Sequence, residues 1–244
     1  MSLYILAGAV ILIALTFFLR KKSSPDASSS LKESPLDLVE STAIVKQLES
    51  LGYFKYADPK NIDTLRVNLV SSISSNFISS VDDDTTLLPL DYRCYTLDGE
   101  TLFEQDGFTD YLKDMQPLFN KMNLKIDITD HIEDYDMTNK WVNHRITINN
   151  KEYIIFANFE GYGWGEAAQR FAEILNDQLE LQGKDERVYL IYAANDGRCV
   201  FLTNEQFALI DKKIKDKKEK PLPVNEWCTF FKVDPTKYKK NMNH

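Results

Sequence analysis

Apolar residues recur at helical spacing in the first part of the chain that follows residue 36. Such a repeat of three and four positions is typical of an amphipathic helix. Gly52 can end the first helix in a left-handed cap, and Asp58-Pro59 can open the second. The two predicted apolar stripes are Leu38, Thr42, Val45 and Leu48, and then Ile62, Leu65, Leu69, Ile73 and Phe77, before the run Asp82-Asp83-Asp84.

Alternating apolar and polar residues then predict strands, several of them joined by turn residues. The predicted strands are residues 92–97, turned by Asp98-Gly99, residues 124–128, residues 142–148 joined through Asn149-Asn150 to residues 153–159, and residues 188–193 and 199–202 across Asn195-Asp196-Gly197. Between and after them, helical spacing predicts residues 108–122, divided by Pro117, residues 164–179, ending near Gly183, and a final helix through Phe207, Ile210 and Ile214. Thr203-x-x-Gln206 reads as a capping box for that final helix.

This order has two helices first and then hairpins mixed with helices. It lacks the regular alternation of strand and helix that a parallel sheet requires. The pattern therefore predicts an α+β fold with a mainly antiparallel sheet and packed helices.

The N-terminus carries an uncharged apolar run from Leu3 to Leu19, followed at once by Arg20, Lys21 and Lys22. Seventeen helical residues span roughly 26 Å, near the lower limit for crossing a bilayer core. A cleavable signal peptide would place its positive charges before the apolar core, and a buried core helix is the remaining alternative. We expect an uncleaved anchor in residues 1–22, with the lipid bilayer around residues 3–19.

Positive charges next to a span stay on the cytoplasmic side, so the N-terminus is expected outside and the rest inside. Residues 23–35 are rich in Ser and Pro and predict a linker. Residues 36–244 would then form one cytoplasmic domain at the inner face of the cell membrane. The three cysteines, with no Cys-x-x-Cys pair, favour neither a disulfide scaffold nor a structural zinc site.

Charge divides the chain unevenly. The 244 residues have a formal net charge of −8, which disfavours nucleic acid as a partner. Residues 202–244, which include a basic tail at 212–244, carry ten lysines and six acids, a net charge of +4. The membrane-proximal basic set predicted to meet anionic lipid consists of Arg20, Lys21, Lys22, Lys212, Lys213, Lys217 and Lys218.

The segment Gly161-Tyr-Gly-Trp-Gly165 lies between a predicted strand and a predicted helix, where backbone amides can hold phosphate. It matches neither the dinucleotide nor the P-loop pattern, and Glu160 and Glu166 would repel an anion. A tight turn with close-packed glycines is the favoured interpretation, with partner contact as the alternative.

Carboxylates crowd the segment from Asp127 to Asp136, which also contains His131. A calcium loop starting at Asp134 would need Gly and Glu where the chain has Asn139 and Arg145. A transition-metal site would need further ligands at a recognisable spacing. The segment therefore reads as a solvated acidic loop, and we expect no metal and no cofactor.

The chain contains no sequence motif of nucleophilic catalysis, and we expect no catalytic residue. Cys94 could in principle pair with His131 or His144, but it lies in an apolar strand, where cysteine is usually inert. Acid–base carboxylate pairs, Glu100 with Glu104 or Glu160 with Glu166, are expected by chance among 37 acidic residues.

The composition favours a non-catalytic, membrane-anchored module that binds a basic protein partner through an acidic surface. Small anchored immunity proteins, which neutralise toxins, are a class-level analogy for this role and supply no residues. The alternative is a membrane-tethered hydrolase that uses carboxylates, with or without a divalent cation. The candidate partner-binding residues are Tyr162, Trp164, Glu160, Glu166, Trp227 and Phe230.

Overall fold

The structure, a computed structural model, describes residues 37–73 and 89–239. The described residues make up one compact unit. The predicted span at residues 3–19, its flanking Arg20 to Lys22 and the linker at 23–35 lie outside the described residues. Among the helices that are described, none combines the length and the apolar character that a membrane crossing requires.

Two helices open the described part of the chain, as predicted. The first, α1 (Leu38–Ser50), is capped by Asp37, and α2 (Ile62–Ile73) follows two short 3₁₀ turns at Tyr53–Tyr56 and Pro59–Asn61. The predicted stripe of α1 is wrong in part, because Leu38 is 71% exposed and Thr42 is also exposed. The helix instead buries Ser41, Ile44, Val45 and Leu48, a stripe rotated by about one residue. Phe77 and Asp82–Asp84 lie outside the described residues.

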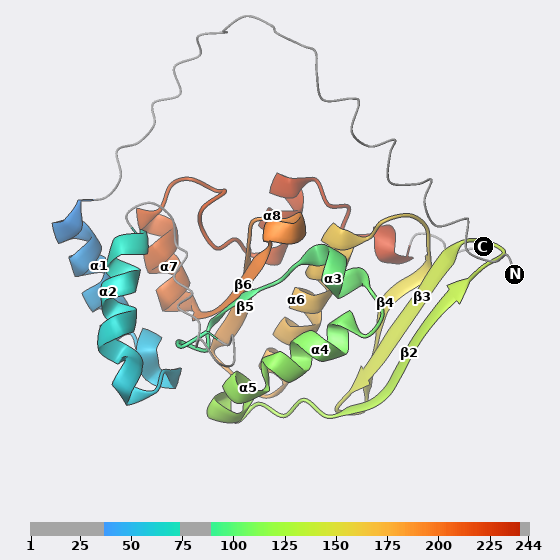
Figure 1. Cartoon of the computed structure of the whole chain (residues 1–244), viewed down its shortest axis with the longest axis horizontal. Helices are drawn as coiled ribbons and strands as arrows, with labels where there is room; N and C mark the ends of the chain where they lie inside the picture. Colours follow the sequence, from blue (N-terminus) through green and yellow to red (C-terminus); the bar gives the residue numbers. More distant parts are fainter. Residues whose placement is uncertain (1–36, 74–88, 240–244) are drawn as a thin grey trace, which may run out of the picture. The chain divides into compact units, whose positions relative to one another are not determined.

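A first antiparallel sheet forms the middle of the fold (Figure 1), in the order β1 (Cys94–Thr96), β6 (Arg198–Thr203), β5 (Glu186–Ile191). Its two faces serve two separate cores. Val188, Leu190 and Phe201 lie in the larger core, whereas Tyr189, Val200 and Leu202 lie in the core shared with α1 and α2.

A second antiparallel sheet contains β2 (Ile128–Asp136), β3 (Trp141–Ile148) and β4 (Lys151–Phe159) in that order. Its inward face packs Ile146, Ile148 and Ile155 into the larger core. Figure 1 shows β2 on the outside of this sheet, at the opposite end of the domain from α1 and α2. The Asn149-Asn150 turn between β3 and β4 is confirmed, with φ of 52° and 65°.

Six further α-helices complete the described fold. They are α3 (Gly99–Phe103), α4 (Gly107–Asp114), α5 (Gln116–Met122), α6 (Trp164–Leu181), α7 (Asn204–Lys213) and α8 (Val224–Phe231), with 3₁₀ turns at Ala194–Asp196 and Lys237–Lys239. Pro117 divides the helical region as predicted, since it lies in the first turn of α5. The capping box of Thr203 and Gln206 is also confirmed.

The α+β class with antiparallel strands is confirmed, but the strands form two sheets rather than one. Asp98-Gly99 is not a hairpin turn: the Asp98 carboxylate accepts hydrogen bonds from Glu100 and Thr101 and caps α3. The predicted strand at 124–128 is absent, and the predicted acidic loop is instead strand β2. The helix ending near Ile214 is not the last, since α8 follows it.

Candidate metal centre

Strands β2 and β3 bring three metal-ligating side chains together. Glu133 on β2 pairs directly across the ladder with His144 on β3, and His131 lies two residues before Glu133. Side chains two residues apart on a strand point to the same face, so all three lie on one face of the sheet. Among the described residues, this is the group of His, Cys, Asp or Glu close enough to hold one ion.

The three candidate ligand atoms form a nearly equilateral triangle. The Nε2 atoms of His131 and His144 lie 3.0 Å apart, and Glu133 Oε1 lies 3.2 Å from each of them. Each atom, placed about 2.1 Å from a common ion, would subtend angles of about 95° with its neighbours. That value lies between the roughly 90° of octahedral and the roughly 109° of tetrahedral coordination.

Protons alone satisfy this triangle poorly. Suppose that both imidazoles are neutral and that one hydrogen lies between their Nε2 atoms. That hydrogen reaches one acceptor, and the remaining lone pairs of the three atoms then face one another. Glu133 Oε1 is buried and, despite its distance of 3.2 Å to both rings, receives no hydrogen bond of good geometry from the described residues. A cation at the centre would satisfy all three atoms at once.

His144 is held in place by the core. Its side chain is 5% exposed, and the Phe108 ring of α4 packs edge-on against its imidazole at a centroid distance of 5.1 Å. Burial, with a smaller contribution from nearby His131, lowers the pKa of His144 to about 3. The ring is therefore neutral at physiological pH, which is the form that binds metals.

Glu133 is oriented by the connection between α3 and α4. Its second oxygen, Oε2, accepts a hydrogen bond of 2.9 Å from the backbone N–H of Asp106. Asp106 has a left-handed φ of 64°, and a Cβ on the following Gly107 would lie 2.1 Å from the Thr101 carbonyl oxygen. This tight turn aims the amide at the carboxylate, a partner of the kind that orients metal ligands in general.

The ladder between β3 and β4 is irregular beside His144. The pairing register shifts on both sides of this residue, between Val142 and His144 and between His144 and Arg145. Asn158 on β4 has a φ of 47°, and its N–H is bonded to the Asn143 side chain. Bulges of this kind are enriched next to active sites, where they redirect a side chain.

A pocket of about 320 Å³ opens beside the triangle. Glu133 and His144 form part of its wall, so ligand positions not taken by the three side chains can face this space. Its lining contains no Lys or Arg, and the residues are Phe103, Gln105, Glu133, Asp134, Tyr135, Val142 and His144.

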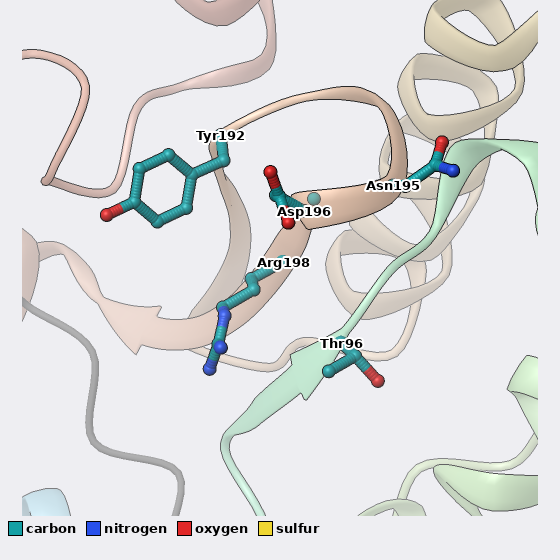
Figure 2. A pocket seen from close by; sticks show the side chains of 6 residues that line it. Thr96, Tyr192, Asn195, Asp196 and Arg198 are labelled. Carbon is teal, nitrogen blue, oxygen red and sulfur yellow. The ribbon is translucent and has the colours of Figure 1, made fainter.

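A second pocket, of about 420 Å³, lies at the loop between β5 and β6 and is lined by Thr96, Tyr192, Asn195, Asp196, Gly197 and Arg198. Figure 2 shows Asp196 with Tyr192 and Asn195 on opposite sides of it. The Tyr192 hydroxyl donates to Glu219, and the Asn195 amide donates to Glu100 over 3.2 Å. Because these groups bond within the protein, this pocket is the weaker candidate for chemistry.

Two glycines at the start of α6, Gly163 and Gly165, allow neighbouring side chains to pack closely. A Cβ on Gly163 would lie 2.8 Å from the Phe103 ring, and one on Gly165 would lie 2.6 Å from Val233. Glu166 is buried and forms an ion pair of 3.2 Å with Lys237. Tyr162, by contrast, is 83% exposed.

The other predicted partner-binding residues differ in the same way. Trp227 is buried, and its indole N–H donates to the Tyr192 carbonyl, so it belongs to the core. Phe230 is 39% exposed, Glu160 is exposed and Trp164 is half-buried.

The lysines of the basic tail also divide into bound and exposed groups. Lys213 pairs with Glu40 over 3.0 Å, and Lys220 is buried in an ion pair with Asp211. Lys212, Lys217 and Lys218 are exposed.

Sequence reasoning found part of this centre and missed its assembly. The sequence predicts a loop for the acids of 127–136 with His131, where the structure has strand β2, and it relates His144 only to Cys94. Cys94 is buried in the core that contains α1 and α2 and does not line the pocket beside His144. The missed signal was the alternation His131, Glu133, Tyr135, which is the period of a strand. Comparison of the chain with protein-family models, with curated proteins and with solved structures finds no match.

Proposed function

We propose that this chain binds one divalent transition-metal ion through His131, Glu133 and His144 and uses it to hydrolyse a substrate held in the adjacent pocket. The observation that carries the proposal is the convergence of two imidazole nitrogens and one carboxylate oxygen within 3.2 Å. The expectation of a protein without a metal gives way here to the alternative, a hydrolase with a divalent cation.

Zinc fits this donor set best. Two imidazoles and one carboxylate are a common ligand set of catalytic zinc, whereas calcium prefers six to eight oxygens. Three protein ligands leave at least one position open for water, and zinc lowers the pKa of such a water to about 7. Zinc held by these three residues would supply a hydroxide nucleophile at its open position, and Gln105 and Asp134 are pocket groups available to hold the substrate.

Metal titration of the purified full-length chain tests the proposal. After chelator treatment, we expect one equivalent of Zn²⁺ to bind, and Co²⁺ to give visible absorption bands in its place. His131→Ala and Glu133→Gln should each weaken binding by more than the roughly 10- to 100-fold that loss of an outer-shell partner costs.

Asp134→Asn is the matched control, because it removes a neighbouring carboxylate of β2 outside the triangle. It should leave the stoichiometry and the affinity for Zn²⁺ unchanged. Equal loss in Glu133→Gln and Asp134→Asn would mean general attraction by acidic side chains and would contradict the centre. Zinc-dependent cleavage of 4-nitrophenyl acetate, absent from Glu133→Gln, tests the hydrolytic step separately.

A second candidate function, a non-catalytic protein-binding module, is favoured by the exposure of Tyr162. Aromatic side chains often carry much of the energy of protein interfaces, and this one is largely in solvent, beside exposed Glu160. Tyr162→Ala should then reduce capture of a protein partner and leave Zn²⁺ binding intact, while Trp227→Ala should damage the fold.

The membrane anchor at residues 3–19 stays part of the proposal, with the domain on the cytoplasmic side. Its support is the apolar run and the three basic residues Arg20, Lys21 and Lys22 that follow it. A reporter active only in the cytoplasm, fused after His244, should be active. Digestion of the domain by external protease in intact cells would contradict this orientation.

A further inference from the structure

The outer edge of β2 offers backbone groups for pairing. β2 is the terminal strand of its sheet, and among residues 37–73 and 89–239 no strand pairs with its outer side. Edge strands are commonly protected by charged side chains, above all Lys, by Pro, by bulges or by shortness. β2 has nine residues and contains neither Lys nor Pro, and its pairing is regular from Asp130 to Asp136 after an irregularity between Ile128 and Asp130, so that stretch offers an edge to an added strand.

Carboxylates give this edge its charge. The strand contains Asp130, Glu133, Asp134 and Asp136 and no basic residue except His131. Arg145 on β3 offsets one of them, at 3.6 Å from Asp130. Two copies of such a strand would repel each other, whereas an extended segment rich in Lys or Arg would be attracted.

Apolar side chains accompany the charges. Ile132 and Tyr135 on β2 are exposed large hydrophobic residues, and Met137, just after the strand, is 79% exposed. Strand addition of this kind gains affinity from backbone hydrogen bonds and specificity from alternate side chains. The surface therefore has the three components that recognition of an extended peptide needs.

We propose that the edge of β2 binds a basic, extended peptide segment as an added strand beside the metal centre. An added strand would lie about 4.8 Å from β2, next to the strand that supplies His131 and Glu133. The inference deepens the proposed function, because it makes a peptide carbonyl the group that the metal-bound hydroxide would attack. Such an attack would form a C–O bond at the carbonyl carbon. Breakdown of the resulting tetrahedral intermediate would break the C–N bond, and the leaving amine would take up a proton from water.

Fluorescence anisotropy with the full-length chain tests the edge directly. The probe is a labelled nine-residue peptide of alternating Lys and Val, and its counterpart has Glu in place of Lys. We expect saturable binding of the Lys peptide and none of the Glu peptide. N-methylation of one set of alternate residues, which removes the donors facing β2, should abolish binding, while methylation of the other set should not.

Charge reversal locates the site. Asp134→Lys should weaken binding of the Lys peptide by about tenfold, since one favourable contact is replaced by repulsion. Glu180→Lys, the same change at an exposed position on α6, should have little effect. Equal effects of the two substitutions, or indifference to both N-methylation patterns, would overturn the added-strand proposal.

Binding of Zn²⁺ and binding of the Lys peptide are separate outcomes. His131→Ala distinguishes them because it removes a metal ligand and leaves the backbone of the β2 edge in place. If the centre fails but the edge is real, the chain binds the Lys peptide without binding Zn²⁺. If the edge fails but the centre is real, Zn²⁺ binds with one-to-one stoichiometry and the peptide does not.

Discussion

The two sheets of this domain are built from similar strands and used differently. The β1–β6–β5 sheet is covered on both faces, so its strands read as nearly continuous apolar runs such as Val188–Ile191. The β2–β3–β4 sheet is covered on one face only, and its outermost strand carries polar and charged residues at most positions. The first sheet therefore contributes mainly stability, and the second offers a surface and a site.

Two buried polar side chains, one beside each sheet, differ in a similar way. Directly before β1 of the first sheet, fully buried Arg93 donates hydrogen bonds to the backbone carbonyls of Gly52, Tyr53 and Phe201, so its guanidinium is fully used in holding the structure. In the second, the buried oxygen of Glu133 faces two imidazoles without a good donor. The Tyr95 hydroxyl of β1 is also buried without a partner, but among the described residues it is Glu133 whose unpartnered oxygen lies in a group able to hold one metal ion.

Removal of Arg93 should give the largest loss of stability. Arg93→Met leaves two buried carbonyls and the half-buried carbonyl of Gly52 without their donor, and we expect a loss of about 3–5 kcal/mol in the free energy of unfolding. Urea denaturation followed by circular dichroism measures it. Arg66→Met is the matched control, since Arg66 pairs with Glu49 and Asp63 at the surface, and its effect on the free energy of unfolding should be far smaller than that of Arg93→Met. A similar cost for both variants would break the contrast.

Zinc should stabilise the domain through the second sheet alone. At a free Zn²⁺ concentration of about 100 times Kd, binding adds about 2.7 kcal/mol to the free energy of unfolding. The increase should vanish in His144→Ala and persist in Asp134→Asn, as followed by thermal denaturation with and without chelator. A zinc-dependent increase that survives His144→Ala would place the ion elsewhere.

A smaller effect is expected from acid, at the junction of the first sheet with the 3₁₀ turn at Tyr53–Tyr56. Burial works to raise the pKa of Glu186, but hydrogen bonds from Lys55 (2.6 Å) and Tyr56 (2.7 Å) outweigh it and hold the pKa below its ordinary value. A carboxyl with a lowered pKa in the folded state adds stability above its unfolded pKa and loses it as the pH falls.

Glu186→Gln should therefore flatten the decline of stability as the pH falls below about 5, as measured by urea denaturation at several pH values. Glu205→Gln, at an exposed position in the first turn of α7, serves as the control and should keep the slope of the parent chain. An unchanged slope in Glu186→Gln would show that this contact contributes nothing to acid sensitivity.

Elements with local signals were predictable from the sequence. The capping box of Thr203 and Gln206 fixes the start of α7 through bonds within four residues, and the Asn149-Asn150 turn depends on two residues that tolerate positive φ. Asp98-Gly99 failed because Asp before Gly serves both hairpin turns and helix caps, and distant packing decides between them.

The candidate centre could not be predicted because it depends on register. Glu133 and His144 are neighbours only because β2 and β3 pair with that alignment, and no local pattern specifies the partner of a strand. The acidic residues of β2 also make it hard to predict as a strand, because Asp has a low strand propensity and β2 contains few apolar residues. The buried face of α2, by contrast, followed from helical spacing, since Leu65, Leu69 and Ile73 of the predicted stripe are buried.

The spacing of His131 and Glu133 on β2, together with the pairing of Glu133 with His144, has an evolutionary consequence. Insertion or deletion of one residue between His131 and Glu133 would turn one of them to the opposite face of the sheet. The rest of the hairpin could keep its pairing, so a lineage could lose the ion in one step while retaining the domain. Gain of the centre would be as abrupt, because a descendant that shifts one strand by one residue aligns all three ligands together.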